Sequence, residues 1–276
     1  MGKEKIILKN IVDENFDKSA LYKRNLLKEY LQVLVLDYIY SSDKYSGLVF
    51  YGGTCLAHCF GLPRLSEDLD FVDTEKKVDL EKMIVDLEIF FKKKTDLTVA
   101  FKAQKFRIYL KFPILNELGL GSGSESDILI LKLEIFNDFI FCKKYQTQIK
   151  PLFKFNRSIL VKTFDLPTLM STKIRALLYR KWEKKNKDGE VIISVKGRDY
   201  FDLMWYLEKN IEPNFDCLEI KTKKELKEKL IDLVEKIDAD SIVFDLENFI
   251  ADKKFVMGLG KNIKEILKDS LNKKFV

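Results

Sequence analysis

Residues 47–72 read GLVFYGGTCLAHCFGLPRLSEDLDFV, and this stretch decides the fold. Its first letters, GLVFY, predict a short buried strand, because a brief apolar run bounded by glycine is typical of a sheet interior. The pair Gly52-Gly53 ends the strand, and residues 54–60 predict a helix that stops at the following glycine. Residues 68–72 alternate between acidic and apolar side chains, which predicts a second strand. The stretch therefore predicts two strands joined by a helix.

The rest of the chain changes character near residue 167. Residues 1–166 mix strand and helix patterns, whereas residues 167–276 are mainly helical in pattern. We therefore expect an α+β protein with two lobes, a mixed sheet with flanking helices followed by a helical lobe. The further strands are expected at residues 97–103, 106–114, 128–136 and 159–164, and the further helices at 19–40, 77–94, 168–184, 199–210, 223–237 and 259–272.

Composition excludes several classes of protein. The chain has 276 residues, of which 46% are hydrophobic and 33% charged, so it can bury a sizeable core and wholesale disorder is excluded. Its net charge of +6 permits a nucleic-acid partner without demanding one. No window approaches the roughly 18 uninterrupted apolar residues of a membrane span. The first residues lack the apolar segment of a secretory signal, so we expect a cytoplasmic protein with its four cysteines reduced.

Two aspartates in the deciding stretch carry the first chemical signal. Asp68 and Asp70 alternate along a strand and share one face, with Cα atoms about 6.6 Å apart. Carboxylates so placed can hold a metal pair separated by roughly 3.5–4 Å, which is the geometry of in-line phosphoryl transfer. Oxygen ligands favour Mg²⁺, with Mn²⁺ as an alternative. The competing interpretation is that an Asp-x-Asp pattern occurs by chance in many exposed strands.

The glycines before the helix supply a place for phosphates. Gly52 and Gly53 let the backbone approach a ligand closely, and Thr54 begins a helix whose free N–H groups attract an anion. A triphosphate could then sit between the start of this helix and the metals.

A third carboxylate stands in the apolar strand at residues 128–136. Its leucines line one face, and Lys132 shares the other face with Glu134. A charge in such a strand is costly unless it is paired or bound to a metal. We favour Glu134 as a metal ligand or as a general base toward an incoming hydroxyl group. An internal Lys132–Glu134 pair is the alternative.

The helical lobe holds a second cluster. Lys173 and Arg180 lie seven residues apart on one face of a predicted helix. The run KGRDYFDL begins another helix and contains Arg198, Asp199 and Asp202. Acidic residues in a first turn also suit the helix dipole, which is their structural explanation. The functional interpretation is that the basic residues contact nucleotide phosphates and the acids orient them.

Three motifs in this order, GGT-x-L … R-x-S-E-D-L-D-F, K-x-R-A-L-L-x-R and K-G-R-D-Y-F-D-L, span residues 47–207. Together they resemble the AbiEii-type toxins of the DNA-polymerase-β-like nucleotidyltransferase superfamily. The resemblance implies a polymerase-β-like core at residues 1–166 and a helical lobe at 167–276 that completes the active site. From the residues and the resemblance together, the expected catalytic residues are Asp68, Asp70, Glu134, Lys173 and Asp202, with Asp68, Asp70 and Glu134 as metal ligands. The expected nucleotide-binding residues are Gly52, Gly53, Thr54, Arg64, Ser66, Lys173, Arg180, Arg198 and Asp199.

The resemblance also implies an activity. Such a protein would transfer nucleotides from an NTP, with Mg²⁺, to the 3′ end of tRNA, and would thereby block translation and arrest growth, with a role in abortive infection. A cognate antitoxin would be encoded nearby. Two alternatives stay open, namely transfer of a nucleotide to a protein side chain and a non-catalytic module that binds nucleotide or RNA.

Overall fold

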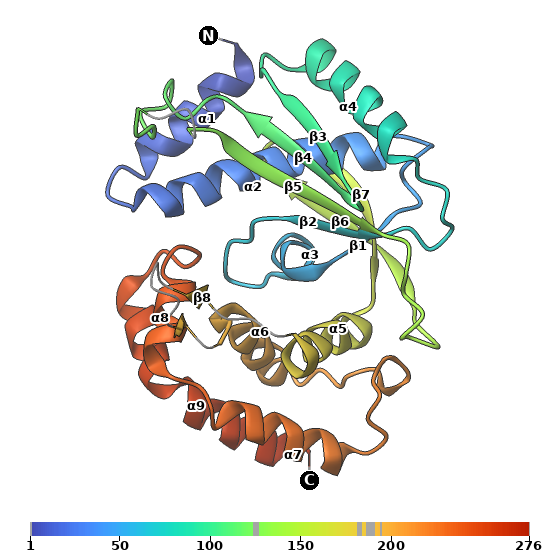
Figure 1. Ribbon diagram of the computed structural model, residues 1–276, viewed down its shortest axis with the longest axis vertical. Coiled ribbons are helices and arrows are strands. Elements are labelled where there is room, and N and C mark those ends of the chain that lie inside the picture. Colours follow the sequence, from blue (N-terminus) through green and yellow to red (C-terminus); the bar gives the residue numbers. More distant parts are fainter. Residues whose placement is uncertain (1, 124–126, 181–183, 186–190, 194, 276) are drawn as a thin grey trace. The chain divides into compact units, whose positions relative to one another are not determined.

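The computed structural model describes residues 2–123, 127–180, 184–185, 191–193 and 195–275 (Figure 1). The chain forms two compact units. The first unit comprises Met1–Phe139 and Thr147–Thr163, and the second comprises Ile140–Gln146 and Phe164–Val276. The sequence patterns predict one boundary, after residue 166, whereas the two units meet three residues earlier in the chain and the short segment 140–146 belongs to the second unit.

The first unit is built on a seven-stranded mixed sheet with the strand order β3-β4-β5-β2-β1-β7-β6. β2 pairs with β5 and β1 with β7 in parallel, whereas β1–β2, β3–β4 and β4–β5 are antiparallel. The expected α+β class with a mixed sheet is therefore confirmed. The strands are β1 (Val49–Tyr51), β2 (Leu69–Val72), β3 (Ala100–Gln104), β4 (Arg107–Phe112), β5 (Leu129–Phe136), β6 (Thr147–Lys154) and β7 (Arg157–Phe164).

Four helices of the first unit flank this sheet (Figure 1). α2 contacts β5, α4 contacts β3 and β4, and α3 contacts β1, β2 and β6. The hydroxyl of Ser19 accepts a hydrogen bond from the Tyr22 N–H at 3.1 Å and so caps α2 where the sequence predicts its start. The bounds are α1 (Lys3–Glu14), α2 (Ala20–Tyr40), α3 (Gly52–Phe60) and α4 (Leu80–Lys94).

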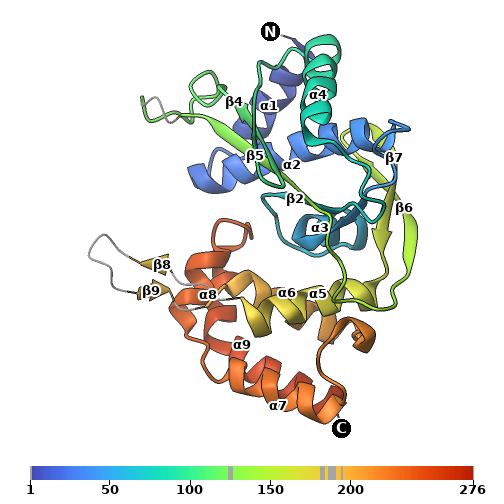
Figure 2. The same cartoon turned by 45° about the vertical axis from the view of Figure 1, so that its right-hand side comes forward.

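The second unit is mainly helical, and α6 lies at its centre. α6 contacts α5, α8 and α9, and nearly all its side chains are buried. Two short strands, β8 and β9, pair antiparallel (Figure 2). The elements are α5 (Leu166–Tyr179), β8 (Lys184–Lys185), β9 (Val191–Ile193), α6 (Gly197–Glu208), the 3₁₀ helix η1 (Phe215–Cys217), α7 (Lys223–Val234), α8 (Ala239–Leu246) and α9 (Lys253–Lys274).

Several elements differ from the sequence prediction. The sequence patterns do not predict α1, β6 or α8: α1 is rich in charged residues, β6 buries only one side chain, and α8 has only eight residues. The helix predicted at 168–184 ends at Tyr179, and Arg180 already has extended backbone angles. No helix in the described ranges is long and apolar enough to span a membrane.

The expectation that all four cysteines are reduced is wrong for one pair. Cys142 and Cys217 form a disulfide within the second unit, although 75 positions separate them in sequence. Cys55 and Cys59 are free thiols. Spacing alone does not reveal connectivity, since η1 brings Cys217 to the 140–146 segment only in the folded unit.

Candidate active site

Strand β2 sets the geometry of the first candidate site. It lies between β1 and β5, so Asp70 is opposite Tyr51 on one side and Glu134 on the other. Asp68 is the residue directly before Leu69, with which β2 begins. The structure therefore brings the three predicted carboxylates together on the adjacent strands β2 and β5.

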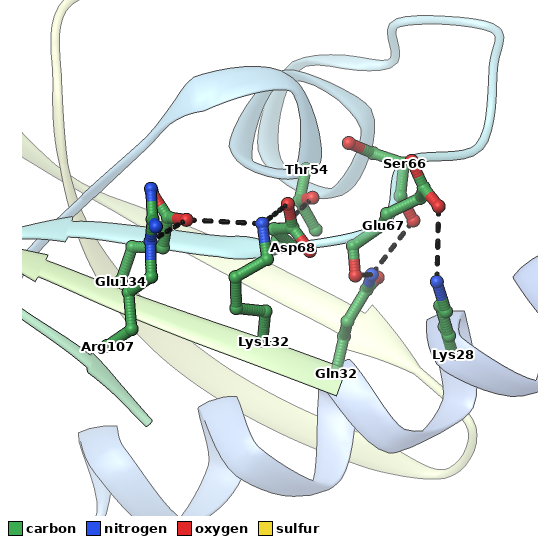
Figure 3. Close-up of polar contacts among 9 residues, drawn as sticks. All are labelled: Lys28, Gln32, Thr54, Ser66, Glu67, Asp68, Arg107, Lys132 and Glu134. Atoms are coloured by element: carbon green, nitrogen blue, oxygen red, sulfur yellow. Dashed lines mark hydrogen bonds and ion pairs between the residues drawn. The ribbon is translucent and has the colours of Figure 1, made fainter. Parts of the chain in front are cut away.

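The Lys132 ammonium lies between two of these carboxylates (Figure 3). Its Nζ is 2.7 Å from Asp68 Oδ2 and 3.2 Å from Glu134 Oε1. Arg107 Nε, on β4, is 2.8 Å from the same Glu134 oxygen. Of the two interpretations of Glu134, the structure therefore contains the ion pair, and Arg107 is a partner that sequence reasoning missed.

The pKa of Lys132 shows which influence dominates at this position. Burial by itself lowers the pKa, but the hydrogen bonds and charges of Asp68 and Glu134 outweigh burial and raise it above its ordinary value. The two carboxylates therefore favour the charged ammonium form of Lys132.

The donor set fits Mg²⁺ only in part. Carboxylate oxygens at Asp68 and Asp70 are the hard ligands that Mg²⁺ prefers. Within the described residues, however, no group of three or more His, Cys, Asp or Glu side chains is arranged to hold a metal ion. Glu134 instead faces two cations. The residues present thus fit a metal at the two aspartates, and as arranged here they do not fit one at Glu134.

Two glycines let the side chains of the site pack closely against the start of α3. Gly52 has φ +81°, and a Cβ there would collide with the carboxylate of Asp70. A Cβ on Gly53 would lie 2.7 Å from Arg64 Nη2 and 3.0 Å from Ser66 Oγ. Both glycines belong to the first turn of α3, which begins two residues before the predicted start at Thr54. Three predicted side chains therefore pack against backbone that only glycine leaves open.

Thr54 supports the site from inside the protein. Its side chain is buried, and its hydroxyl donates a hydrogen bond to the Asp68 carbonyl oxygen (Figure 3). Arg64 is also buried, and its Nη1 donates to the Leu65 carbonyl oxygen at 2.8 Å. Both side chains, predicted to bind nucleotide, are engaged in holding the segment that carries the aspartates.

Helix α2 holds the same segment from the other side. Gln32 Nε2 donates to the carbonyl oxygens of Ser66 and Glu67 at 2.9 and 3.1 Å (Figure 3). Gln32 Oε1 faces His58 Nε2 at 3.1 Å. Sequence reasoning missed Gln32, and the available signal was a polar residue in the apolar middle of the helix.

The second unit holds the other predicted cluster. Lys173 Nζ, on α5, is 2.7 Å from Asp202 Oδ2 and 3.4 Å from Asp199 Oδ1, both on α6. Arg180 Nη1 is 3.2 Å from the other oxygen of Asp199. Asp202 is fully buried and Asp199 nearly so, whereas the Arg180 side chain is 44% exposed. Arg180 is thus the member of this cluster that can reach a ligand from solvent.

Arg198 is directed elsewhere within the same unit. Its backbone N–H and Nε donate to Asp245 Oδ2 at 2.9 and 3.3 Å, and its guanidinium lies 4.0 Å from the ring centroid of Phe249. Asp245 belongs to α8, which the sequence did not predict. In this structure Arg198 therefore ties the start of α6 to α8.

A cavity of about 230 Å³ opens beside this cluster. Its basic lining consists of Arg180, Lys196 and Lys236, and Asp199 is its acidic member. Burial, reinforced by the neighbouring basic residues, lowers the pKa of Lys196 to about 8. Sequence reasoning missed Lys196. The available signal was a lysine at the N-cap of α6, where its charge is unfavourable because it opposes the helix dipole.

A larger cavity lies in the first unit and contains none of the predicted residues. It measures about 760 Å³ and lies between α1, α2 and α4. Arg157 lines it and pairs with Asp37, which also lines it.

The chain matches one family model and is similar in fold to solved structures. A family model described as "Nucleotidyl transferase AbiEii toxin, Type IV TA system" matches residues 35–266. No curated protein matches the chain. Among solved structures, MenT4, a nucleotidyltransferase toxin from Mycobacterium tuberculosis H37Rv, is similar with a TM-score of 0.55 and 11% identity, covering 98% of this chain and 89% of that chain. JHP933 from Helicobacter pylori has a TM-score of 0.47 and 18% identity, covering 91% of this chain and 94% of that chain.

The contact between Gly52 and Asp70 can be tested against a matched glycine. Gly61 also has positive φ, at +75°, but open space surrounds its Cβ position. Gly61→Ala should cost about 1 kcal/mol of unfolding free energy from backbone strain alone. Gly52→Ala should cost roughly 1–3 kcal/mol more, because the new methyl group overpacks the Asp70 carboxylate. Urea unfolding of both variants measures the difference, and equal losses would contradict the proposed close packing.

The shifted pKa of Lys196 predicts a pH-dependent stability. Between pH 8 and 10.5, the folded and ordinary values, the folded protein binds fewer protons than the unfolded chain, so its stability rises with pH. Lys196→Met should therefore raise the unfolding free energy at pH 7 by up to about 3 kcal/mol, and this gain should shrink by pH 10. Denaturant unfolding at both pH values tests it, with the exposed Lys224→Met as control. A gain in unfolding free energy that does not change with pH would contradict the lowered pKa of Lys196.

Proposed function

The chain belongs to the AbiEii family of nucleotidyl transferase toxins of type IV toxin–antitoxin systems, and from this membership we propose that it transfers nucleotides from an NTP, with Mg²⁺, to the 3′ end of tRNA. The similar fold of MenT4, itself a nucleotidyltransferase toxin, supports the class of reaction. The single observation that carries the proposal is the placement of Asp68 and Asp70 beside the glycine-initiated helix α3.

In the proposed reaction, the terminal hydroxyl of the acceptor attacks the α-phosphorus of the NTP. A new oxygen–phosphorus bond forms, the bond to the β-phosphate bridge breaks, pyrophosphate leaves and the hydroxyl proton is released. Mg²⁺, held by Asp68 and Asp70, would supply positive charge to the phosphate oxygens when bound. A phosphate of the NTP would bind at the first turn of α3, which begins at Gly52, because backbone N–H groups at a helix start attract anions.

The basic residues around the cavity of the second unit are proposed to bind phosphate groups. Arg180 is exposed enough to contact a phosphate, and Lys196 and Lys236 line the same cavity. Asp199 holds Arg180 in place, and Lys173 is held in turn by Asp199 and Asp202. Arg198 is assigned a supporting role through Asp245 rather than a contact with nucleotide.

The proposal extends to partners and location. Membership of a type IV family supports a cognate antitoxin and growth arrest as the outcome, with a role in abortive infection. The proposed location is the cytoplasm, where NTP and tRNA occur together. Disulfides are uncommon in that compartment, and the second unit contains one, Cys142–Cys217.

Transfer to tRNA and transfer to protein are distinguished by one assay. Purified protein is incubated with Mg²⁺, each of the four α-labelled NTPs, and either total tRNA or lysate protein. Label in lengthened tRNA supports the proposal, whereas label in protein alone supports the alternative acceptor. EDTA should abolish either signal.

Substitution of the aspartates tests the chemistry. Asp68→Asn and Asp70→Asn keep the side-chain volume and remove the charge, and each should lower transfer at least about 100-fold, since metal stabilisation contributes several kcal/mol. Asp13→Asn, an exposed acid on α1, is the matched control and should retain activity. Labelling that survives in both site variants would refute the assignment.

A further inference from the structure

Lys132 contacts the acidic site of the first unit, and the proposed function gives it no task. It shares a face of β5 with Glu134, and it stands opposite Tyr109 of β4, two residues from the position where Arg107 is opposite Glu134. Its side chain is 28% exposed, and the Asp68 side chain is 33% exposed. Because the Asp68–Lys132 ion pair is only partly buried, it can form and can also separate.

The cluster formed by the three carboxylates, Lys132 and Arg107 is nearly neutral without a metal. Asp68, Asp70 and Glu134 supply three negative charges, and Lys132 and Arg107 supply two positive ones. Three carboxylates gathered on two adjacent strands, β2 and β5, would repel one another, since like charges side by side in a sheet are destabilising. The two cations remove most of that repulsion.

The two cations differ in how firmly they are held. Arg107 presents a rigid planar fork to Glu134, whereas Lys132 carries a compact ammonium on a flexible four-carbon chain. Lys132 also divides its hydrogen bonds between Asp68 and Glu134, so it can give up one carboxylate and keep the other. A divalent cation on Asp68 would compete with the ammonium for Oδ2, the oxygen that lies 2.7 Å from Nζ.

We infer that Lys132 is a tethered counter-ion of the acidic site, which holds Asp68 in the metal-free protein and is displaced from it when a divalent cation binds. Glu134 is then the anchor that retains Lys132 on the sheet, and the metal is held without it. This inference rests on the proposed function, because it requires a divalent cation at Asp68. It also accounts for the absence of a three-carboxylate cage among the described residues.

The inference predicts that removing the ammonium strengthens metal binding. Lys132→Met should bind Mn²⁺, used as the spectroscopic probe, about fivefold more tightly than the wild type, since a partly exposed ion pair is worth up to about that factor. Free Mn²⁺ is counted by electron paramagnetic resonance without nucleotide or tRNA, so the readout is independent of transfer. In EDTA the same variant should melt at a lower temperature than the wild type, and Mn²⁺ should raise its melting temperature by the larger amount.

A charge-matched control separates local competition from a general change in field. Lys111 lies on β4 opposite Ile130, next along the same face of the sheet. Lys111→Met alters the net charge equally and should change Mn²⁺ affinity less than twofold, because screening weakens interactions between separated exposed charges. Lys132→Gln repeats the test with a polar side chain, in case the methionine variant does not fold.

The assignment of Glu134 is tested in the background of Lys132→Met. If Glu134 only anchors Lys132, adding Glu134→Gln leaves the Mn²⁺ affinity unchanged. If Glu134 is a metal ligand, the same substitution weakens Mn²⁺ binding. Unchanged or weaker Mn²⁺ binding in folded Lys132→Met, or no Mn²⁺ binding that depends on Asp68 in either protein, would overturn the inference. Normal Mn²⁺ binding without nucleotide transfer would instead refute the proposed function and leave the counter-ion role standing.

Discussion

The site of the first unit depends on the pairing of β2 with its two neighbours. β2 spans only Leu69–Val72, yet it lies between β1 and β5 and so has no free edge. Phe50 and Phe71, opposite each other in the β1–β2 pair, are fully buried and stack with centroids 5.1 Å apart. Their burial fixes the register, and a shift of one residue would turn Asp70 to the opposite face. The acidic site is thus a consequence of apolar packing behind it.

The ion pairs of the two units differ in their exposure to solvent. Asp68 and Lys132 are each about a third exposed, so solvent competes with their ion pair. Asp202 is fully buried, and the Lys173 ammonium lies 2.7 Å from its carboxylate. Removing one partner of such a buried pair typically costs about 3–5 kcal/mol, because the other charge is left alone. Lost activity in a Lys173 or Asp202 variant therefore says little about catalysis unless folding is measured beside it.

Sequence patterns predicted the parts of this protein that depend on local periodicity. The strands around the aspartates and the capped start of α2 follow from neighbouring residues alone. Alternation also showed that Lys132 and Glu134 share a face, but not that Asp68 and Arg107 stand across from them. Contacts such as Gln32 with the 66–67 backbone, Arg198 with Asp245, and Cys142 with Cys217 join distant segments, and one sequence carries no record of such pairs. The catalytic and metal-binding roles stay predictions, since geometry places these residues without testing them.

The Gln32 amide has a further consequence for the one histidine of the chain. Its nitrogen donates to two backbone carbonyls, so its oxygen must be the atom that faces His58, and the histidine must carry its proton on Nε2. Burial lowers the pKa of His58 to about 3, with a smaller contribution from Lys154. The imidazole therefore holds a single neutral tautomer throughout the physiological range. Histidine is the side chain that usually changes charge near neutral pH, but His58 does not. The contact of Gln32 with the backbone before Asp68 is therefore independent of pH in this range.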